Sequence, residues 1–329
     1  MAGTPCIEKR RQLVMAGLSA PLVMAAGSSQ AAAYPSRPIE LIVPFGPGGG
    51  ADQLGRAIAS LIEGPLKVSV PVINVPGATG NTGMVKLLSG APDGYGMCIL
   101  IGDTLATIAK GGRWKIEETV AVGVLMQQST GLFVKADSPI KTFDDLLKES
   151  KKKDLKIATV GLGSADDLHI GQMNVKGSKF RAVPYSKPGE RYSTILGGHT
   201  DVLIEQGGDV KRFLDSGQMR QLVLFADKED PNFPGVPLAK AYGFNLAISQ
   251  FRSIVMKAGT DPKAIQTISD ALAQAAKSDK YKQFLKDTAS FPNSFMPAPE
   301  ENPSLKREMK LLAETKFKNP PQTPSRLGN

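Results

Sequence analysis

Mainly apolar runs in this chain alternate with segments whose apolar residues fall on one helical face. The first run, Ile39–Val43, has the β-branched composition of a buried parallel strand. Leu54, Ile58 and Ile62 then recur at helical spacing, and the intervening residues 46–50 read GPGGG. A strand, a loop with almost no side chains and a helix start expose backbone N–H groups beside the positive end of a helix dipole. This segment therefore predicts an anion-binding loop.

The same alternation continues after the first helix. Strands are predicted at Val68–Val75 and Met97–Ile101, with a glycine-rich loop and a short helix, Pro76–Leu88, between them. Gly102 and Asp103 follow the second of these strands directly. Because ligands gather at the carboxyl ends of the strands in such a βαβ series, both loops join the candidate site.

A second series follows an apolar stretch, Ala121–Val134, that lacks a helical period and predicts strands crossing to another domain. Here the strand Lys156–Val160 runs into GLGSADDLHIG (Gly161–Gly171), which repeats the strand, glycine turn and helix start of the opening segment. Ser164 is the predicted N-cap of that helix, with Asp167 at the capping-box spacing. The other predicted elements are strands at 180–185, 201–204, 222–225 and 253–257, and helices at 143–153, 189–196, 210–215, after the Asp261-Pro262 cap, and at 300–316.

The N-terminus has the pattern of an export signal and is left out of the fold. Lys9, Arg10 and Arg11 precede a mild apolar core, and three alanines end at Ala33, where cleavage is predicted. The arginine pair indicates twin-arginine export, and an ordinary secretory signal is the alternative. Cleavage would remove three basic residues and one acidic residue, which lowers the net charge from +9 to +7. Only Cys98 would then remain, so no disulfide is expected within the mature chain.

Several classes of chemistry lack the residues that they need. Ala51-Asp52 follows the first glycine loop where a Walker loop requires Lys-Ser/Thr, and the G-x-G-x-x-G spacing of dinucleotide sites is missing in its usual form. The two histidines, His169 and His199, come without a G-x-S-x-G elbow, and we interpret both as packing residues. The sequence shows no metal-ligand spacing and no interleaving of basic and aromatic residues. We therefore predict a protein that is not an enzyme and that binds no metal, cofactor or nucleic acid.

Four segments carry a family resemblance: YPSRPIELIVPFGPGGGADQ (Tyr34–Gln53), PGATGNTG (Pro76–Gly83), APDGYGMCILIG (Ala91–Gly102) and VPYSKPGERYSTILGGHTD (Val183–Asp201). They resemble the extracytoplasmic solute receptors of tripartite tricarboxylate transporters, the Bug or TctC-like family. This resemblance implies an α/β fold of the periplasmic binding protein type, in which two domains joined by crossover strands enclose a ligand cleft. Residues 34–131 and 255–329 would form the first domain, and residues 132–254 the second.

The resemblance also implies which residues hold the ligand. In the family, one carboxylate is held largely by main-chain groups of the first glycine loop, and the opposite domain supplies a second loop and a turn. An aspartate matching Asp201 can pair with an amine in members that bind amino acids. The implied ligand-binding residues are Phe45, Pro47, Gly48, Gly49, Asp52, Asn81, Thr82, Gly102, Asp103, Gly161, Gly163, Ser164, Tyr185 and Asp201.

One departure from the family pattern bears on the ligand. Where many members read Tyr-Lys-Gly-Gly, this chain places Lys187 and Arg191 after Tyr185. We expect at least one of these cations to meet a distal carboxylate, which favours a di- or tricarboxylate; the alternative is that both face solvent at a helix start. The sequence thus predicts a monomeric periplasmic receptor that serves the large and small membrane subunits of a tripartite transporter. A periplasmic sensor for a membrane partner and a secreted hydrolase remain alternatives.

Overall fold

The computed structural model describes residues 33–109, 112–248 and 250–297. The described residues from Tyr34 onward belong to one compact unit, which contains two separate β-sheets. Residues 1–32 of the predicted signal segment and the predicted helix at 300–316 lie outside the described residues. None of the helices within the described ranges is long and apolar enough to span a membrane.

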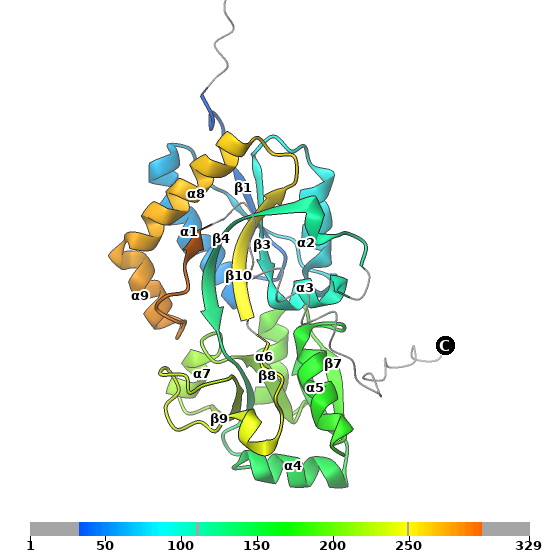
Figure 1. Cartoon of the computed structure of the whole chain (residues 1–329). Helices are drawn as coiled ribbons and strands as arrows, with labels where there is room; N and C mark the ends of the chain where they lie inside the picture. Colours follow the sequence, from blue (N-terminus) through cyan, green and yellow to red (C-terminus); the bar gives the residue numbers. More distant parts are fainter. Residues whose placement is uncertain (1–32, 110–111, 249, 298–329) are drawn as a thin grey trace, which may run out of the picture. The chain divides into compact units, whose positions relative to one another are not determined.

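The first predicted series forms a six-stranded sheet with the order β11-β4-β10-β3-β1-β2 (Figure 1). β1 pairs in parallel with β2 and β3, as predicted, whereas β10 runs antiparallel to both β3 and β4. The strand β2 is shorter than the predicted Val68–Val75, because Pro71 has no N–H for the ladder. The strands are β1 (Glu40–Val43), β2 (Val72–Asn74), β3 (Gly96–Ile101), β4 (Thr119–Gln128), β10 (Gln250–Lys257) and β11 (Met296–Pro297).

Helices cover both faces of this sheet, which explains why its strands are apolar without alternation. Leu41 and Val43 point to the face that packs on α1 and α8, and Ile42 points to the face that packs on α2 and α3. Figure 1 shows the two groups of helices on opposite sides of the sheet. The helices are α1 (Gly50–Leu66), α8 (Pro262–Lys277) and α9 (Asp279–Asp287) on one face, and α2 (Asn81–Ser89) and α3 (Gly102–Ile108) on the other.

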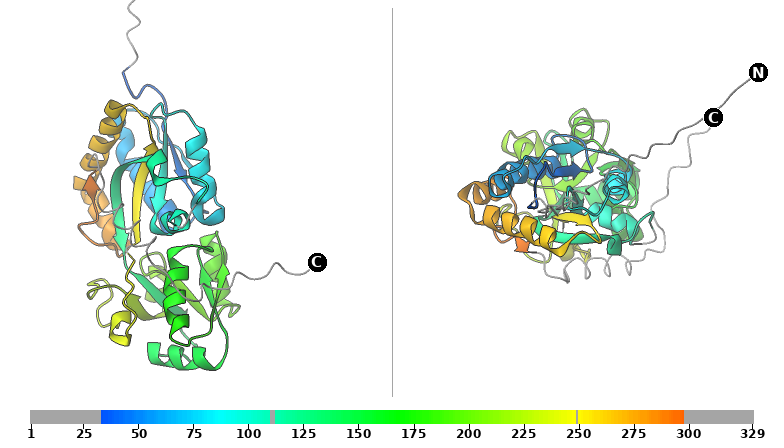
Figure 2. Two further views of the ribbon diagram at one scale, coloured as in Figure 1. Left: turned by 45° about the vertical axis from the view of Figure 1, so that its right-hand side comes forward. Right: turned by 90° about the horizontal axis from the view of Figure 1, so that it is seen from above.

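The second series forms a five-stranded sheet with the order β7-β6-β8-β5-β9. Its two faces pack on α4 and α5, and on α6 and α7, respectively (Figure 2). The strands are β5 (Thr130–Lys135), β6 (Leu155–Thr159), β7 (Phe180–Pro184), β8 (Val202–Gln206) and β9 (Met219–Phe225). The helices are α4 (Phe143–Lys152), α5 (Ala165–Val175), α6 (Pro188–Leu196) and α7 (Lys211–Asp215).

The predicted crossover at Ala121–Val134 is confirmed, because β4 belongs to the first sheet and the next strand, β5, to the second. Only Ser129 separates these two strands. The predicted domain boundaries themselves stay a prediction. We note that the boundary at 131/132 falls inside β5 and that the whole of β10 pairs within the first sheet.

Two helix caps test the local predictions. The Asp261 carboxylate accepts the Lys263 N–H at 2.8 Å at the start of α8, as predicted. Ser164 occupies the N-cap position of α5, but its hydroxyl makes no capping bond and has no hydrogen-bond partner in the part of the chain that the structure describes. The predicted capping box is therefore wrong, because the neighbouring Asp167 turns back to the Gly163 N–H instead.

Candidate functional site

The two glycine loops, residues 46–52 (GPGGGAD) and 161–167 (GLGSADD), share one local structure. Gly48 and Gly163 both adopt a left-handed backbone, with φ of 84° and 77°. In each loop the N–H of this glycine donates to the aspartate four residues on, to Asp52 at 3.0 Å and to Asp167 at 2.6 Å. Glycine adopts this conformation without the steric cost that a Cβ atom brings. The first N–H groups of the helix that follows each loop have no acceptor within the helix, so a carboxylate can accept from them.

A carboxylate from the second sheet already occupies the start of α1. Asp209 follows β8, and its carboxylate accepts a hydrogen bond from the Gly50 N–H. Arg252 of β10 donates to Asp209 Oδ2 at 2.5 Å, and both side chains are buried. A Cβ atom at Gly50 would lie only 2.1 Å from Asp209 Oδ1, so this close approach requires glycine. Burial raises the pKa of Asp209 to about 6, although Arg252 opposes that rise.

A carboxyl group from the first sheet occupies the equivalent position at the start of α5. Asp103 is the second residue of α3, and its carboxyl group accepts a hydrogen bond from the Ala165 N–H. The Gln250 side-chain nitrogen donates to Asp103 Oδ1 at 3.4 Å. Burial, together with the nearby Glu205 carboxylate, raises the pKa of Asp103 to about 7. Each sheet thus sends one carboxyl group to a helix start of the other.

Asp166 brings a second carboxyl group to the α5 side. Its Oδ2 accepts the Val160 N–H at 3.0 Å, and its side chain is buried. Burial and the neighbouring Asp103 raise the pKa of Asp166 well above its ordinary value. The matching residue of the first loop is Ala51, which carries no charge.

A second buried ion pair, between α6 and β8, lies beside these groups. Arg191 of α6 donates from Nε to Glu205 Oε2 at 3.0 Å, and its Nη2 pairs with the same oxygen. The Tyr192 hydroxyl also donates to this oxygen, at 3.1 Å, while Arg191 Nη1 donates to the Tyr185 carbonyl at 3.0 Å. Burial opposes the charge of Arg191, but Glu205 raises the pKa of its guanidinium.

These ionisable groups surround one cavity of about 30 Å³, which is room for about one water molecule. Segments of both sheets contribute to its wall. The lining residues are Phe45, Gly49, Gly50, Ala51, Ile101, Asp103, Val160, Asp166, Pro188, Arg191, Glu205, Gln206, Asp209 and Arg252.

Of the residues predicted from the sequence, four line this cavity: Phe45, Gly49, Asp103 and Arg191. Sequence reasoning missed its other charged members, Asp166, Glu205, Asp209 and Arg252. Aligning the two glycine loops residue by residue draws attention to Asp166, because it replaces Ala51 of the first loop. For Asp209 and Arg252, no local signal marks the site, because their pairing joins distant parts of the chain.

Several predicted residues support the loops without lining the cavity. Asp52 is engaged by Arg56 and Asn74 in addition to Gly48, and these hydrogen bonds outweigh burial and lower its pKa. The Asn81 amide bonds Ala78 and Thr107 and accepts from Trp114 at 2.7 Å. Of the others, Pro47, Gly48 and Thr82 are exposed, and Gly102 is buried at the start of α3.

The second glycine loop meets the segment that follows β2. Thr79 Oγ1 donates to the Leu162 carbonyl at 3.2 Å. A Cβ atom at Gly161 would lie 2.1 Å from Thr79 Oγ1, so the second glycine loop is in direct contact with the segment that follows β2. The predicted loop residues Gly161, Gly163 and Ser164 therefore contact or adjoin the first half of the molecule, next to the cavity.

Lys187 is the N-cap residue of α6, and its side chain forms an exposed ion pair with Glu190 at 3.1 Å. Its aliphatic part packs over Gly46. Asp201 lies elsewhere, at the opposite end of the second sheet from the cavity-lining carboxyl end of β8. Its Oδ2 accepts the Lys156 N–H at 2.8 Å, and the structure does not bring it together with the other predicted residues.

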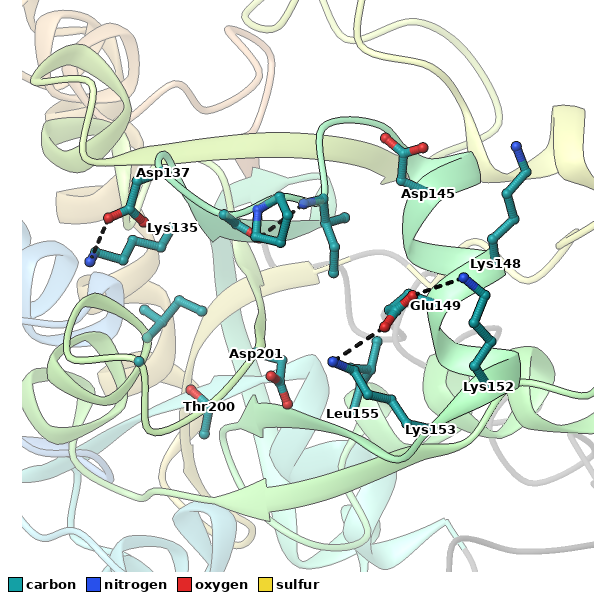
Figure 3. A pocket seen from close by; sticks show the side chains of 15 residues that line it. Lys135, Asp137, Asp145, Lys148, Glu149, Lys152, Lys153, Leu155, Thr200 and Asp201 are labelled. Atoms are coloured by element: carbon teal, nitrogen blue, oxygen red, sulfur yellow. Dashed lines mark hydrogen bonds and ion pairs between the residues drawn. The ribbon is translucent and has the colours of Figure 1, made fainter.

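Asp201 borders a larger surface pocket of about 580 Å³ between α4, β6 and the end of α6 (Figure 3). Lysines and acidic residues alternate around it. Lys135 pairs with Asp137, and Glu149 pairs with both Lys152 and Lys153. Because these charges are exposed and already paired, we regard the small buried cavity as the candidate site in spite of the size difference.

The described residues contain no group of histidine, cysteine and acidic side chains that could hold a metal ion. His169 is fully buried, stacks on Phe225 at 4.2 Å between ring centroids, and has its pKa lowered to about 3 by burial. It therefore stays neutral and acts in packing. His199 is exposed on the loop after α6.

A family model described as "Tripartite tricarboxylate transporter family receptor" matches residues 54–310. A protein of Cupriavidus necator, the UPF0065 protein in gbd 5'region, is 30% identical over 298 residues, which cover 85% of this chain and 88% of that protein. A TctC solute binding protein from Polaromonas superposes with a TM-score of 0.63 at 26% identity, covering 85% and 98% of the two chains. MatC (Rpa3494) from Rhodopseudomonas palustris, solved with bound malate, has the same fold, with a TM-score of 0.78 at 21% identity and coverage of 86% and 99%.

The two-sheet α/β architecture is thus that of the periplasmic binding proteins, as the sequence predicts. The family consists of solute-binding receptors, and the match spans most of the chain. The chain therefore belongs to the tripartite tricarboxylate transporter receptor family.

Proposed function

We propose that this receptor captures a small carboxylate in the cavity between its two sheets and delivers it to the membrane subunits of a tripartite transporter. The observation that carries the proposal is the Asp209 carboxylate at the start of α1, where Gly50 and Arg252 meet it. A site that stabilises one carboxylate has the charge and donors for another. The malate bound in the MatC structure supports the same class of ligand.

Capture would require the two sheets to move apart and close again. The present cavity holds about one water, so a molecule of the size of malate needs more room. The proposed domains, 34–131 with 255–329 and 132–254, would rotate about the crossover strands β4 and β5. On closure the ligand carboxylate would take the place of Asp209 at the start of α1.

The sequence-based preference for a di- or tricarboxylate rests on Lys187 and Arg191. Both cations are paired with carboxylates of the chain itself, Glu190 and Glu205. We therefore limit this proposal to small carboxylates and place the anchor at Arg252. Export, cleavage after Ala33, a periplasmic location and a monomeric state complete the proposal.

A thermal-shift screen of small carboxylates, followed by small-angle scattering for closure, tests this function. We expect at least one carboxylate to raise the melting temperature and to make the protein more compact. The doubly substituted variant Arg252→Gln/Asp209→Asn removes both charges together, so the fold keeps its charge balance while the anchor is lost. This variant should lose the response, and Arg37→Gln/Asp93→Asn, which removes an exposed ion pair, should keep it. A response that survives in the double variant would place the ligand elsewhere.

A further inference from the structure

We propose that Asp103 and Asp166 receive a cationic group, so that the ligand of this cavity is a zwitterion with an ammonium as well as a carboxylate. This inference rests on the proposed function and names the ligand class of the same site. It differs from the polycarboxylate preference drawn from the sequence.

The first argument is the balance of charge around the cavity. Four carboxyl groups and two guanidinium groups line it. Each guanidinium has its own carboxylate, Arg252 with Asp209 and Arg191 with Glu205. Among the described residues, Asp103 and Asp166 have no ion pair, although each is only 2% exposed. Burial of two such groups without a counter-charge is costly, so a proton or a bound cation must compensate them.

The second argument concerns what faces this pair. The donors that reach it are neutral: the Gln250 amide and the Ala165 N–H at Asp103, and the Val160 N–H at Asp166. The charged groups facing it from β8 and α6 are Glu205 and Arg191, which are bound to each other. The raised pKa values of both aspartates are consistent with protons that fill the place of a cation.

A third, independent observation is an unused acceptor in the same cavity. Among the described residues, Asp209 Oδ1 has no hydrogen-bond partner, and Asp209 is more than nine-tenths buried. An ammonium group carries three donors and no acceptor, so it suits a cavity in which carboxyl oxygens are in excess. A second carboxylate on the ligand would instead add negative charge to a cavity in which carboxyl groups already outnumber guanidinium groups.

Matched ligand pairs test the proposal by calorimetry on the purified protein. Aspartate against malate, 4-aminobutyrate against succinate, and 6-aminohexanoate against adipate each exchange an ammonium for a hydroxyl or carboxylate on a similar skeleton. We expect at least one amino compound to bind about tenfold more tightly than its partner. Its binding should also release protons, measured from the heat in two buffers of different ionisation enthalpy at pH 7.

Variants connect the effect to the acid pair. Asp103→Asn and Asp166→Asn should each weaken the amino compound about tenfold or more while leaving its partner unchanged or bound more tightly. Asp144→Asn, an exposed acid of α4, serves as the matched control and should change neither. If the hydroxy- and dicarboxylates bind as tightly as the amino compounds, or if binding takes up protons, the inference is wrong and the proposed function stands. If no carboxylate of either kind binds, the proposed function fails with it.

Discussion

The two glycine loops follow the same backbone path but hold their helix starts in different electrostatic states. At α1, the incoming carboxylate of Asp209 is matched by Arg252. At α5, the incoming Asp103 meets another acid, Asp166, where the first loop has Ala51. One side is therefore a closed ion pair, and the other is an acid pair that depends on protons or a ligand. The same loop geometry thus supplies an anion site on one side and, on our proposal, a cation site on the other.

The largest effect is expected on the paired side. Arg252→Met would leave Asp209 buried without its partner, and we expect the free energy of unfolding to fall by about 3–5 kcal/mol. Arg56→Met, which removes the half-exposed partner of Asp52, should cost no more than about 1 kcal/mol. Denaturant unfolding of both variants measures the difference. Adding Asp209→Asn to Arg252→Met should recover most of the lost stability. If it does not, the α1 start is not held by an ion pair, and the contrast with the α5 start is wrong.

A pH effect is expected on the unpaired side. The pKa of Asp103 is about 7 in the folded protein against 3.8 for the free side chain, so the folded state holds a proton that the unfolded state has released between these values. Its contribution to stability is therefore lost as the pH rises from about 4 to about 7, at up to about 1.4 kcal/mol per pH unit. Asp103→Asn should lose less stability between pH 5 and pH 8 than the natural protein does.

The same pH series on Asp144→Asn gives the control, because this residue is exposed and does not line the cavity. Its pH dependence should follow that of the natural protein. Equal slopes for all three proteins would show that Asp103 is ionised throughout, and the two helix starts would then be electrostatically alike.

The smallest effect tests what the loops have in common. Gly48→Ala and Gly163→Ala force a Cβ atom into a left-handed conformation, and each should cost about 1–2 kcal/mol. Of the described residues, none lies within 4 Å of the added atom at Gly48, and at Gly163 only the Thr107 methyl group does, at 3.9 Å. The backbone therefore sets the cost. Gly189→Ala, in the open first turn of α6, should be neutral or stabilising. Thermal unfolding measures the cost of each substitution. Clearly unequal costs at Gly48 and Gly163 would mean that the two loops are not equivalent.

Local pattern was enough to predict most of the strands and helices. The glycine loops, the crossover at β4 and β5, and the cap of α8 all depend on residues close together in the chain. The elements that were missed include α3, α9 and β11, which are only 7, 9 and 2 residues long. Segments this short are stabilised mainly by packing on the sheet or on longer helices. The site was predicted in part: the loops were found, and most of the charged residues between them were not.

The sequence by itself determined that this chain has two glycine-rich helix starts able to hold anions, because backbone conformation and helix dipoles are local properties. The tertiary structure decided which charges meet there. Asp209 reaches Arg252, and Asp103 reaches Asp166, only because the two sheets bring separate segments around one cavity. Burial then changes what these groups do, since a carboxyl group that would be ionised in water needs a partner, a proton or a ligand when it is enclosed.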